Sequence, residues 1–209
     1  MSRRGVLIVI SGFAGAGKGS IVKKLVSQYE NYALSISMTT RSPRPGEVDG
    51  REYFFVTKEE FEQAIKDDKL VEHANYVGNY YGTPREYVER QLDLGKDVIL
   101  EIETNGALQI KKKFPDAVLV FVTPPSATVL HERLIGRGTE TPEIVAKRMA
   151  KASEESTLMC QYDFILVNDD LDACTKEMHN IVRATHHTPG CDKEFLEKIK
   201  EELKAYSRP

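Results

Sequence analysis

The sequence lacks several features that would place the protein in a special class. Its 209 residues carry a formal net charge of only −3, and they contain neither an internal repeat nor a low-complexity tract. This balance gives no reason to expect a nucleic-acid partner, which would favour a basic face. The first apolar run, residues 5–11, is too short to span a bilayer and no later run is longer, so we expect no membrane partner.

Cysteine is also scarce. Cys160, Cys174 and Cys191 are odd in number, scattered and without C-x-x-C spacing. This usage is typical of thiols in a reducing compartment rather than of a disulfide framework. The length suits one α/β core with an inserted subdomain. Together these observations predict a cytoplasmic globular protein.

Buried-strand patterns alternate with helical patterns along most of the chain. The continuous apolar run of residues 5–11 is typical of a strand buried on both faces, and residues 18–29 place apolar side chains at helical spacing. Further buried strands are predicted for residues 98–102, 118–122 and 164–167, and helices for residues 106–113, 126–135, 142–156 and 171–185. This alternation predicts an α/β fold with a parallel sheet flanked by helices.

Two segments depart from this order. Residues 37–94 mix turn-rich sequence with predicted strands and helices, namely strands 52–56, 71–76 and 80–82 and helices 58–66 and 84–92. We expect an inserted mixed α/β subdomain there, between core segments 5–36 and 95–187, because inserted units commonly carry substrate recognition. The charged amphipathic residues 193–206 predict a helix packed outside the core, within a C-terminal extension of residues 188–209.

The turn after the first predicted strand is rich in glycine. Its glycines allow consecutive backbone N–H groups to face one point, which suits phosphate oxygens, and the helix that follows adds its positive N-terminal end. Lys18 can then reach the β- and γ-phosphates of a nucleotide. A glycine-rich turn without a ligand is the alternative, which the buried strand before it and the amphipathic helix after it disfavour. The predicted phosphate loop comprises Gly12, Phe13, Ala14, Gly15, Ala16, Gly17, Lys18, Gly19 and Ser20.

The loop departs from the generic motif at one position. Gly19 stands where a serine or threonine usually binds Mg²⁺, and Ser20 follows it. We therefore expect Mg²⁺ to be held largely through water and the nucleotide's own oxygens. Glu101, at the carboxyl end of a predicted central strand, is the candidate for orienting magnesium-bound water.

A second candidate phosphate site lies in the inserted segment. Arg41 and Arg44 are three residues apart in a stretch that prolines keep out of helix. Both guanidinium groups can converge on a phosphate there and donate bidentate hydrogen bonds. Taken alone, an R-x-x-R pair would more often be two solvated surface charges.

Longer motifs decide between a phosphate site and a pair of surface charges. Residues 37–55 follow the pattern SxTTRxPRxGExxGxxYxF, which resembles the signature of guanylate kinases. Four further segments resemble that family in family order: GNYYGT at 78–83, LEIE-xx-GALQ at 100–109, RLxGRGTE at 133–140 and VNDDLD at 167–172. The similarity covers about residues 5–185. It implies a P-loop nucleoside monophosphate kinase that transfers the γ-phosphoryl group of ATP to GMP, with a short lid at about residues 136–150.

Carried over by position, the resemblance also implies the acceptor site. The GMP phosphate would be held by Arg41, Arg44, Tyr53 and Tyr81, with Ser37 nearby, and the base would be read by Glu72, Thr83 and Glu103. The chemistry agrees, because a carboxylate accepts from guanine N1–H and the 2-amino group while a threonine hydroxyl donates to O6. The family more often has aspartate where this chain has Glu103, and Pro-Ser where it has Phe13-Ala14.

For the transfer step, the resemblance implies positive charge around the moving phosphoryl group. The residues concerned are Lys18, Arg133, Arg137 and Arg148, although Arg133 could also be a solvated residue of a helix face. Asn168 matches a family position that contacts adenine, through backbone groups. No general base is expected, because a GMP phosphate is already nucleophilic at neutral pH.

Two other functions remain open at this stage. The first is a guanylate-kinase-like binding module for partner peptides, a class that typically lacks the working phosphate loop found here at Gly17-Lys18. The second is a kinase for a different nucleoside monophosphate. For the kinase reading the expected partners are ATP and GMP, and the expected state is a monomer or a homodimer.

Overall fold

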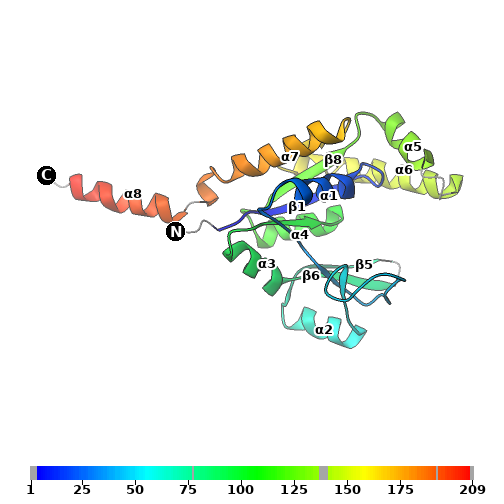
Figure 1. Ribbon diagram of the computed structural model, residues 1–209, viewed down its shortest axis with the longest axis horizontal. Coiled ribbons are helices and arrows are strands. Elements are labelled where there is room, and N and C mark those ends of the chain that lie inside the picture. The colour runs from blue at the N-terminus through cyan, green and yellow to red at the C-terminus, as the bar shows by residue number, and fades with distance from the viewer. Residues whose placement is uncertain (1–3, 77, 137–140, 192, 208–209) are drawn as a thin grey trace.

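The computed structural model describes residues 4–76, 78–136, 141–191 and 193–207. Its elements form a larger core sheet covered by helices and a smaller sheet beside it (Figure 1). The C-terminal helix α8 (Lys193–Tyr206) extends away from both sheets.

The core sheet has five strands, and all of its pairings are parallel. Their order across the sheet is β2 (Tyr32–Leu34), β7 (Asp97–Glu101), β1 (Leu7–Gly12), β8 (Val118–Thr123) and β9 (Phe164–Val167). The predicted parallel sheet flanked by helices is therefore confirmed. The chain extends the sheet first on one side of β1 and then on the other, and in such sheets ligands bind beyond the carboxyl ends of the strands near this reversal.

Continuous apolar runs become central strands here because both faces of the sheet are covered. On β1, Ile8 and Ile10 belong to one buried cluster, whereas Leu7 and Val9 belong to another on the opposite face. The first face is covered by α1 (Lys18–Gln28), α5 (Ala127–Gly136), α6 (Pro142–Ser156) and α7 (Leu171–Thr185). The second is covered by α3 (Arg85–Asp93) and α4 (Thr104–Lys113).

Strand β9 forms at the predicted residues, but the prediction that it is buried is wrong. Phe164, Ile165 and Val167 are exposed, and only Leu166 is buried. The reason is position, because β9 is an edge strand that pairs with β8 alone. An apolar run does not reveal whether a strand lies at the centre or the edge of its sheet.

The smaller sheet contains four strands in a mixed arrangement. Its order is β4 (Tyr53–Phe55), β3 (Ser37–Thr39), β6 (Asn79–Pro84) and β5 (Leu70–Tyr76), with β3 parallel to β4 and antiparallel to β6. Helix α2 (Lys58–Lys66) covers this sheet through Phe61 and Ala64, which pack with Leu70. Strands β2 and β3 were not predicted, since three residues carry too little periodicity to identify a strand.

Helix α8 forms at the predicted residues and lies outside the core. None of its described residues is buried, and Phe195, Leu203 and Tyr206 are exposed. Its start is held to the core by an ion pair of 2.6 Å between Lys193 Nζ and Asp116 Oδ2. Two single helical turns, η1 (Met159–Gln161) and η2 (Pro189–Cys191), complete the described elements.

Among the described residues, no helix is both long enough and apolar enough to cross a membrane.

Candidate active site

The phosphate loop joins β1 to α1 at the carboxyl edge of the core sheet. Gly12 has a φ of 142°, and a Cβ there would lie 2.0 Å from the Val122 carbonyl oxygen, so only glycine lets the chain turn this close to β8. Gly17 precedes α1 with a φ of 91°. No side chain of the described residues caps α1, and its first-turn N–H groups are therefore available to an anion.

Lys18 lies across this loop. Its Nζ donates to the carbonyl oxygens of Gly12, at 2.8 Å, and Phe13, at 3.1 Å. The Glu101 carboxylate is close by, since a Cβ added to Gly19 would lie 3.7 and 3.9 Å from its two oxygens. Burial raises the pKa of Glu101, and the Lys18 charge opposes this shift. The predicted phosphate-binding lysine and the predicted acidic residue thus lie together at the start of α1, where Ser20 is exposed.

The arginine turn of the smaller sheet brings a second group of predicted residues together. The Arg41 guanidinium lies 5.4 Å from the ring centroid of Tyr53, and the rings of Tyr53 and Tyr81 are 6.0 Å apart, edge to face. Ser37 is the register partner of Tyr53 on the neighbouring strand. Arg44 lies in the same turn and is exposed.

Sequence reasoning did not assign a role to Glu47, which organises this turn. Its carboxylate accepts two hydrogen bonds from Arg41 Nη2, at 2.9 and 3.0 Å, and one from the Arg44 backbone N–H at 2.7 Å. The hydrogen bond from Arg41 lowers the pKa of Glu47, and the same bond raises the pKa of Arg41. The available signal was its spacing, since a glutamate shortly after two arginines in a proline-rich turn is a natural counter-ion.

Glu72 and Thr83 form a buried polar pair on β5 and β6. The Thr83 hydroxyl donates to Glu72 Oε1 at 2.8 Å, and the two residues are 5% and 0% exposed. The other oxygen, Oε2, would lie 3.2 Å from a Cβ on Gly106, so glycine at this point lets α4 approach the carboxylate. A buried carboxylate that accepts one side-chain hydrogen bond still has capacity to accept further donors from a ligand.

Burial raises the pKa of Glu72, and the Thr83 hydrogen bond and the Lys113 charge oppose that shift. The folded protein therefore holds this proton more tightly than the unfolded chain does, and ionisation of Glu72 opposes folding. We expect Glu72→Gln to be more stable than the parent at neutral pH in the absence of nucleotides. The difference should shrink as the pH falls through the raised pKa of Glu72.

Urea unfolding of both proteins between about pH 7 and pH 5 measures this difference. A gap in unfolding free energy that stays constant over the range would show that the carboxylate titrates at its ordinary pKa.

Glu103 pairs with a lysine of α6. It immediately precedes α4, its side chain is 54% exposed, and its Oε2 lies 3.7 Å from Lys151 Nζ on α6. Lys151 Nζ also lies 3.9 Å from the largely buried Glu155. In this structure Glu103 therefore contacts the helix that begins in the predicted lid, and its role at the base beside Glu72 and Thr83 stays a prediction.

The phosphate loop and the Glu72–Thr83 pair adjoin through one short segment. Its first residue, Glu101, lies against Gly19, and its last, Gly106, lies against Glu72. An extended chain advances about 3.5 Å per residue, so the Cα atoms of Glu101 and Gly106 lie within about 18 Å of each other. The two candidate sites are therefore joined by a segment no longer than this.

Helix α5 packs directly on the phosphate loop, since a Cβ on Gly15 would lie 3.0 Å from Leu134 Cδ2. The predicted arginine on this helix, Arg133, is half-buried. Burial raises the pKa of the nearby Cys174 thiol to about 11, and the Arg133 charge opposes this effect. Arg148 is half-buried on α6. Arg137, also predicted to act in transfer, lies outside the described residues.

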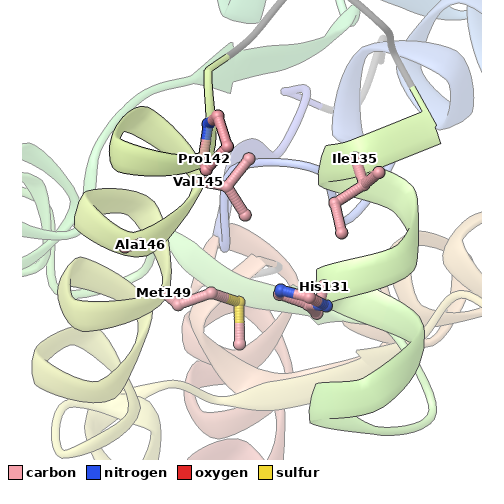
Figure 2. A pocket seen from close by; sticks show the side chains of 6 residues that line it. All are labelled: His131, Ile135, Pro142, Val145, Ala146 and Met149. Atoms are coloured by element: carbon pink, nitrogen blue, oxygen red, sulfur yellow. The ribbon is translucent and has the colours of Figure 1, made fainter.

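An open cavity of about 590 Å³ lies between α5 and α6. Figure 2 shows Ile135 and Val145 directed toward each other from the two helices, with His131 and Met149 nearby. Apolar side chains dominate the described part of its lining, which contains neither Lys18 nor Arg41. This cavity is thus distinct from both candidate phosphate sites.

Asn168 lies at the carboxyl end of β9 and is only 6% exposed. Its backbone N–H donates to the Thr123 carbonyl at 2.8 Å, which joins the ends of β9 and β8. Its side chain contacts the phosphate loop at Ala16, a contact that sequence reasoning did not anticipate. No local pattern could have indicated it, because the two residues are 152 positions apart.

The parallel sheet, the loop and its lysine define a P-loop nucleotide-binding fold with an inserted mixed subdomain. The family model for guanylate kinase matches residues 4–185, and the chain belongs to the guanylate kinase family. Relatives described as guanylate kinase are 51% identical in Lactococcus lactis over 90% of this chain and 91% of theirs, and 51% identical in Streptococcus pneumoniae over 89% and 90%. The crystal structure of guanylate kinase from Anaplasma phagocytophilum superimposes with a TM-score of 0.75 and 29% identity over 96% of both chains.

Proposed function

We propose that this protein transfers the γ-phosphoryl group of ATP to GMP, forming ADP and GDP. The observation that carries the proposal is the segment from Glu101 to Gly106, which adjoins the lysine-bearing loop at one end and the Glu72–Thr83 pair at the other. Phosphoryl transfer requires two nucleotide sites close together, and it depends mainly on positioning and on positive charge. The family membership and the names of its relatives support the same activity.

On the donor side, the loop N–H groups and Lys18 would hold the ATP phosphates. Lys18 is already directed into the loop, where it donates to two carbonyl oxygens that a phosphate would replace as its partners. Backbone groups at Asn168 would contact adenine. We assign ATP to Gly12, Phe13, Ala14, Gly15, Ala16, Gly17, Lys18, Gly19, Ser20 and Asn168.

On the acceptor side, the arginine turn would hold the GMP phosphate. A phosphate entering there would compete with Glu47 for Arg41, and the neighbouring Tyr53 and Tyr81 could donate from their hydroxyl groups. We assign the GMP phosphate to Ser37, Arg41, Arg44, Tyr53 and Tyr81.

Glu72 would read the guanine base by accepting hydrogen bonds from N1–H and the 2-amino group, and the Thr83 hydroxyl would turn from Glu72 to donate to O6. Adenine has neither of these donors, so it would offer the buried carboxylate no hydrogen bond in return for its water. Such sites discriminate strongly, by about 10⁴-fold. Glu103 would join them by leaving Lys151 when the base binds.

In the transfer step, an oxygen of the GMP phosphate would attack the γ-phosphorus as the bond to the β–γ bridging oxygen breaks. The charge that builds on the leaving ADP would be stabilised by Lys18, Arg133, Arg137 and Arg148. No protein group need remove a proton from the acceptor phosphate.

The residues beside the loop also fit Mg²⁺. Magnesium usually takes one or two protein oxygens and completes its shell with water and nucleotide phosphates. Glu101 lies beside the first turn of α1, which carries Ser20, and these two residues would hold the ion, mainly through water. When bound, Mg²⁺ would neutralise charge on the ATP phosphates. We further propose that the protein acts in the cytoplasm, where its three unpaired cysteines suit a reducing environment, as a monomer or homodimer.

An acceptor panel tests the proposal. With ATP and Mg²⁺ supplied, we expect rapid product formation from GMP and dGMP, and a kcat/KM for AMP and UMP lower by about 10⁴-fold. Product analysis by chromatography measures each rate.

Two results of the panel would contradict the proposal. Faster turnover of AMP or UMP than of GMP would favour a kinase for another nucleotide and reject the base assignment. A folded protein that binds GMP but forms no GDP would favour a binding module of the same fold.

A further inference from the structure

Asn168 connects the last strand of the core sheet to the phosphate loop that follows the first. Its side-chain Nδ2 donates to the Ala16 carbonyl oxygen at 2.8 Å. A carbonyl oxygen can only accept, so the amide nitrogen must be the atom that faces it. The contact is buried, and the hydrogen bond is therefore shielded from competing water.

This hydrogen bond acts on a particular peptide unit. The Ala16–Gly17 peptide is planar and trans, so its C=O and N–H point in opposite directions. Holding the Ala16 carbonyl toward Asn168 therefore holds the Gly17 N–H on the side away from Asn168. Gly17 is the residue that opens α1, and its N–H is one of the donors that a loop of this type offers to phosphate.

Packing reinforces the constraint. A Cβ on Gly17 would lie 2.3 Å from Asn168 Nδ2, so the amide is pressed against the glycine backbone. A positive φ of 91° at Gly17 is a conformation that glycine leaves readily. The Asn168 amide supplies an external contact that keeps the peptide in one orientation. The hydrogen bond from the Asn168 backbone N–H to Thr123 in turn fixes the backbone of Asn168.

We propose that the Asn168 side chain is a positioning residue for the donor nucleotide: it holds the Ala16–Gly17 peptide so that the Gly17 N–H faces the ATP phosphates. The proposal rests on the proposed function and deepens it. Asn168 was assigned above to adenine through its backbone, and its side chain now receives a separate task. One residue would thereby join adenine recognition to the geometry of the phosphate site.

Asn168→Asp tests this role with almost no change of shape, because it replaces the donor with an acceptor facing the Ala16 carbonyl. We expect the KM for ATP and the Kd for ADP to rise about 10- to 100-fold, as for loss of a buried hydrogen bond. The KM for GMP should change by less than about twofold. Asn180→Asp makes the same chemical change at an exposed position of α7, and it should leave both constants unchanged.

A second variant controls for the charge that Asn168→Asp would add at a buried position. Asn168→Ser removes the amide without adding a carboxylate, and its shorter side chain should lose the bond to Ala16. We expect the same selective loss of ADP affinity by calorimetry, together with a shifted Gly17 amide signal in an NMR spectrum of ¹⁵N-glycine-labelled protein. Retained GMP binding shows that either variant is folded.

The unmodified protein supplies an independent measurement. The side-chain amide protons of Asn168 should remain protected from exchange when ADP is bound, because the bond to Ala16 persists in the loaded site. Release of these protons on ADP binding would overturn the proposal, as would equal losses for ATP and GMP, or an unchanged ADP affinity in the folded variants.

Failure of this inference is distinguishable from failure of the proposed function. The ADP titrations and the Gly17 signal require no turnover, and they test Asn168 even if the parent protein forms no GDP. Conversely, if the parent enzyme phosphorylates GMP and the Asn168 variants keep its affinity for ADP, only the positioning role is contradicted.

Discussion

Replacing Lys18 with methionine is expected to lower kcat about 100- to 1,000-fold, the range seen when one group that stabilises transition-state charge is removed. Lys18 Nζ lies in the loop, bonded to the carbonyl oxygens of Gly12 and Phe13, and it would be the first cation to meet the β- and γ-phosphates. Methionine retains most of the length of the side chain and removes its charge. Steady-state turnover of GMP with saturating ATP measures the effect.

The same substitution should leave the affinity for GMP unchanged. The proposed acceptor site is built from the smaller sheet and the start of α4, and Lys18 is assigned only to the donor site. Calorimetry should therefore give a GMP Kd within about twofold of the parent value. Lys23→Met removes a similar charge from an exposed position on α1, and its kcat should match the parent. A kcat for Lys18→Met within about threefold of the parent would contradict the assignment of the loop.

Replacing Glu72 with glutamine is expected to weaken GMP binding about 100-fold or more, with ATP binding unchanged. The carboxylate is 5% exposed, and its only protein hydrogen-bond donor from a side chain in the described residues is Thr83. Guanine N1–H and the 2-amino group would meet a carboxylate as two donors facing two acceptors. Glutamine turns one of those acceptors into a donor. Two donors would then face each other in a buried site, where no water is present to accept their hydrogen bonds.

Separate calorimetric titrations with GMP and with ATP measure this selectivity. Glu59→Gln provides the matched control, since Glu59 is an exposed carboxylate on α2 in the same part of the molecule. Retained ATP binding shows that Glu72→Gln is folded, so reduced GMP binding is then not due to unfolding. Equal losses for both nucleotides would remove Glu72 from the base site.

Periodic elements of the fold could be predicted closely from the sequence. Helices α2, α6 and α7 begin and end at the predicted residues, because each shows several turns of apolar spacing. Strands β2 and β3 escaped prediction, since three residues cannot establish a period. The edge position of β9 also escaped it, because burial depends on which neighbours the rest of the chain supplies.

The candidate site divides in the same way. Gly12, Gly17 and Lys18 could be predicted because a phosphate loop is a local object, made from consecutive backbone groups. The role of Glu47 as counter-ion of the arginine turn could have been inferred from its spacing, but the family motif does not indicate it. The contact between Glu103 and Lys151 could not be predicted, because Lys151 lies 48 positions further along the chain on another helix.

By itself, the sequence determined the local chemistry of this protein: a glycine loop with its lysine, a proline-bounded turn with two arginines, and apolar runs that alternate between strand and helix. These follow from neighbouring residues, whose backbone preferences act without the rest of the fold. Only the tertiary structure decided that Gly106 lies against Glu72, that Glu103 faces Lys151 and that Asn168 holds the loop at Ala16. Each of these contacts joins segments far apart in the chain, and their energies exist only once the sheets have brought those segments within a few ångströms.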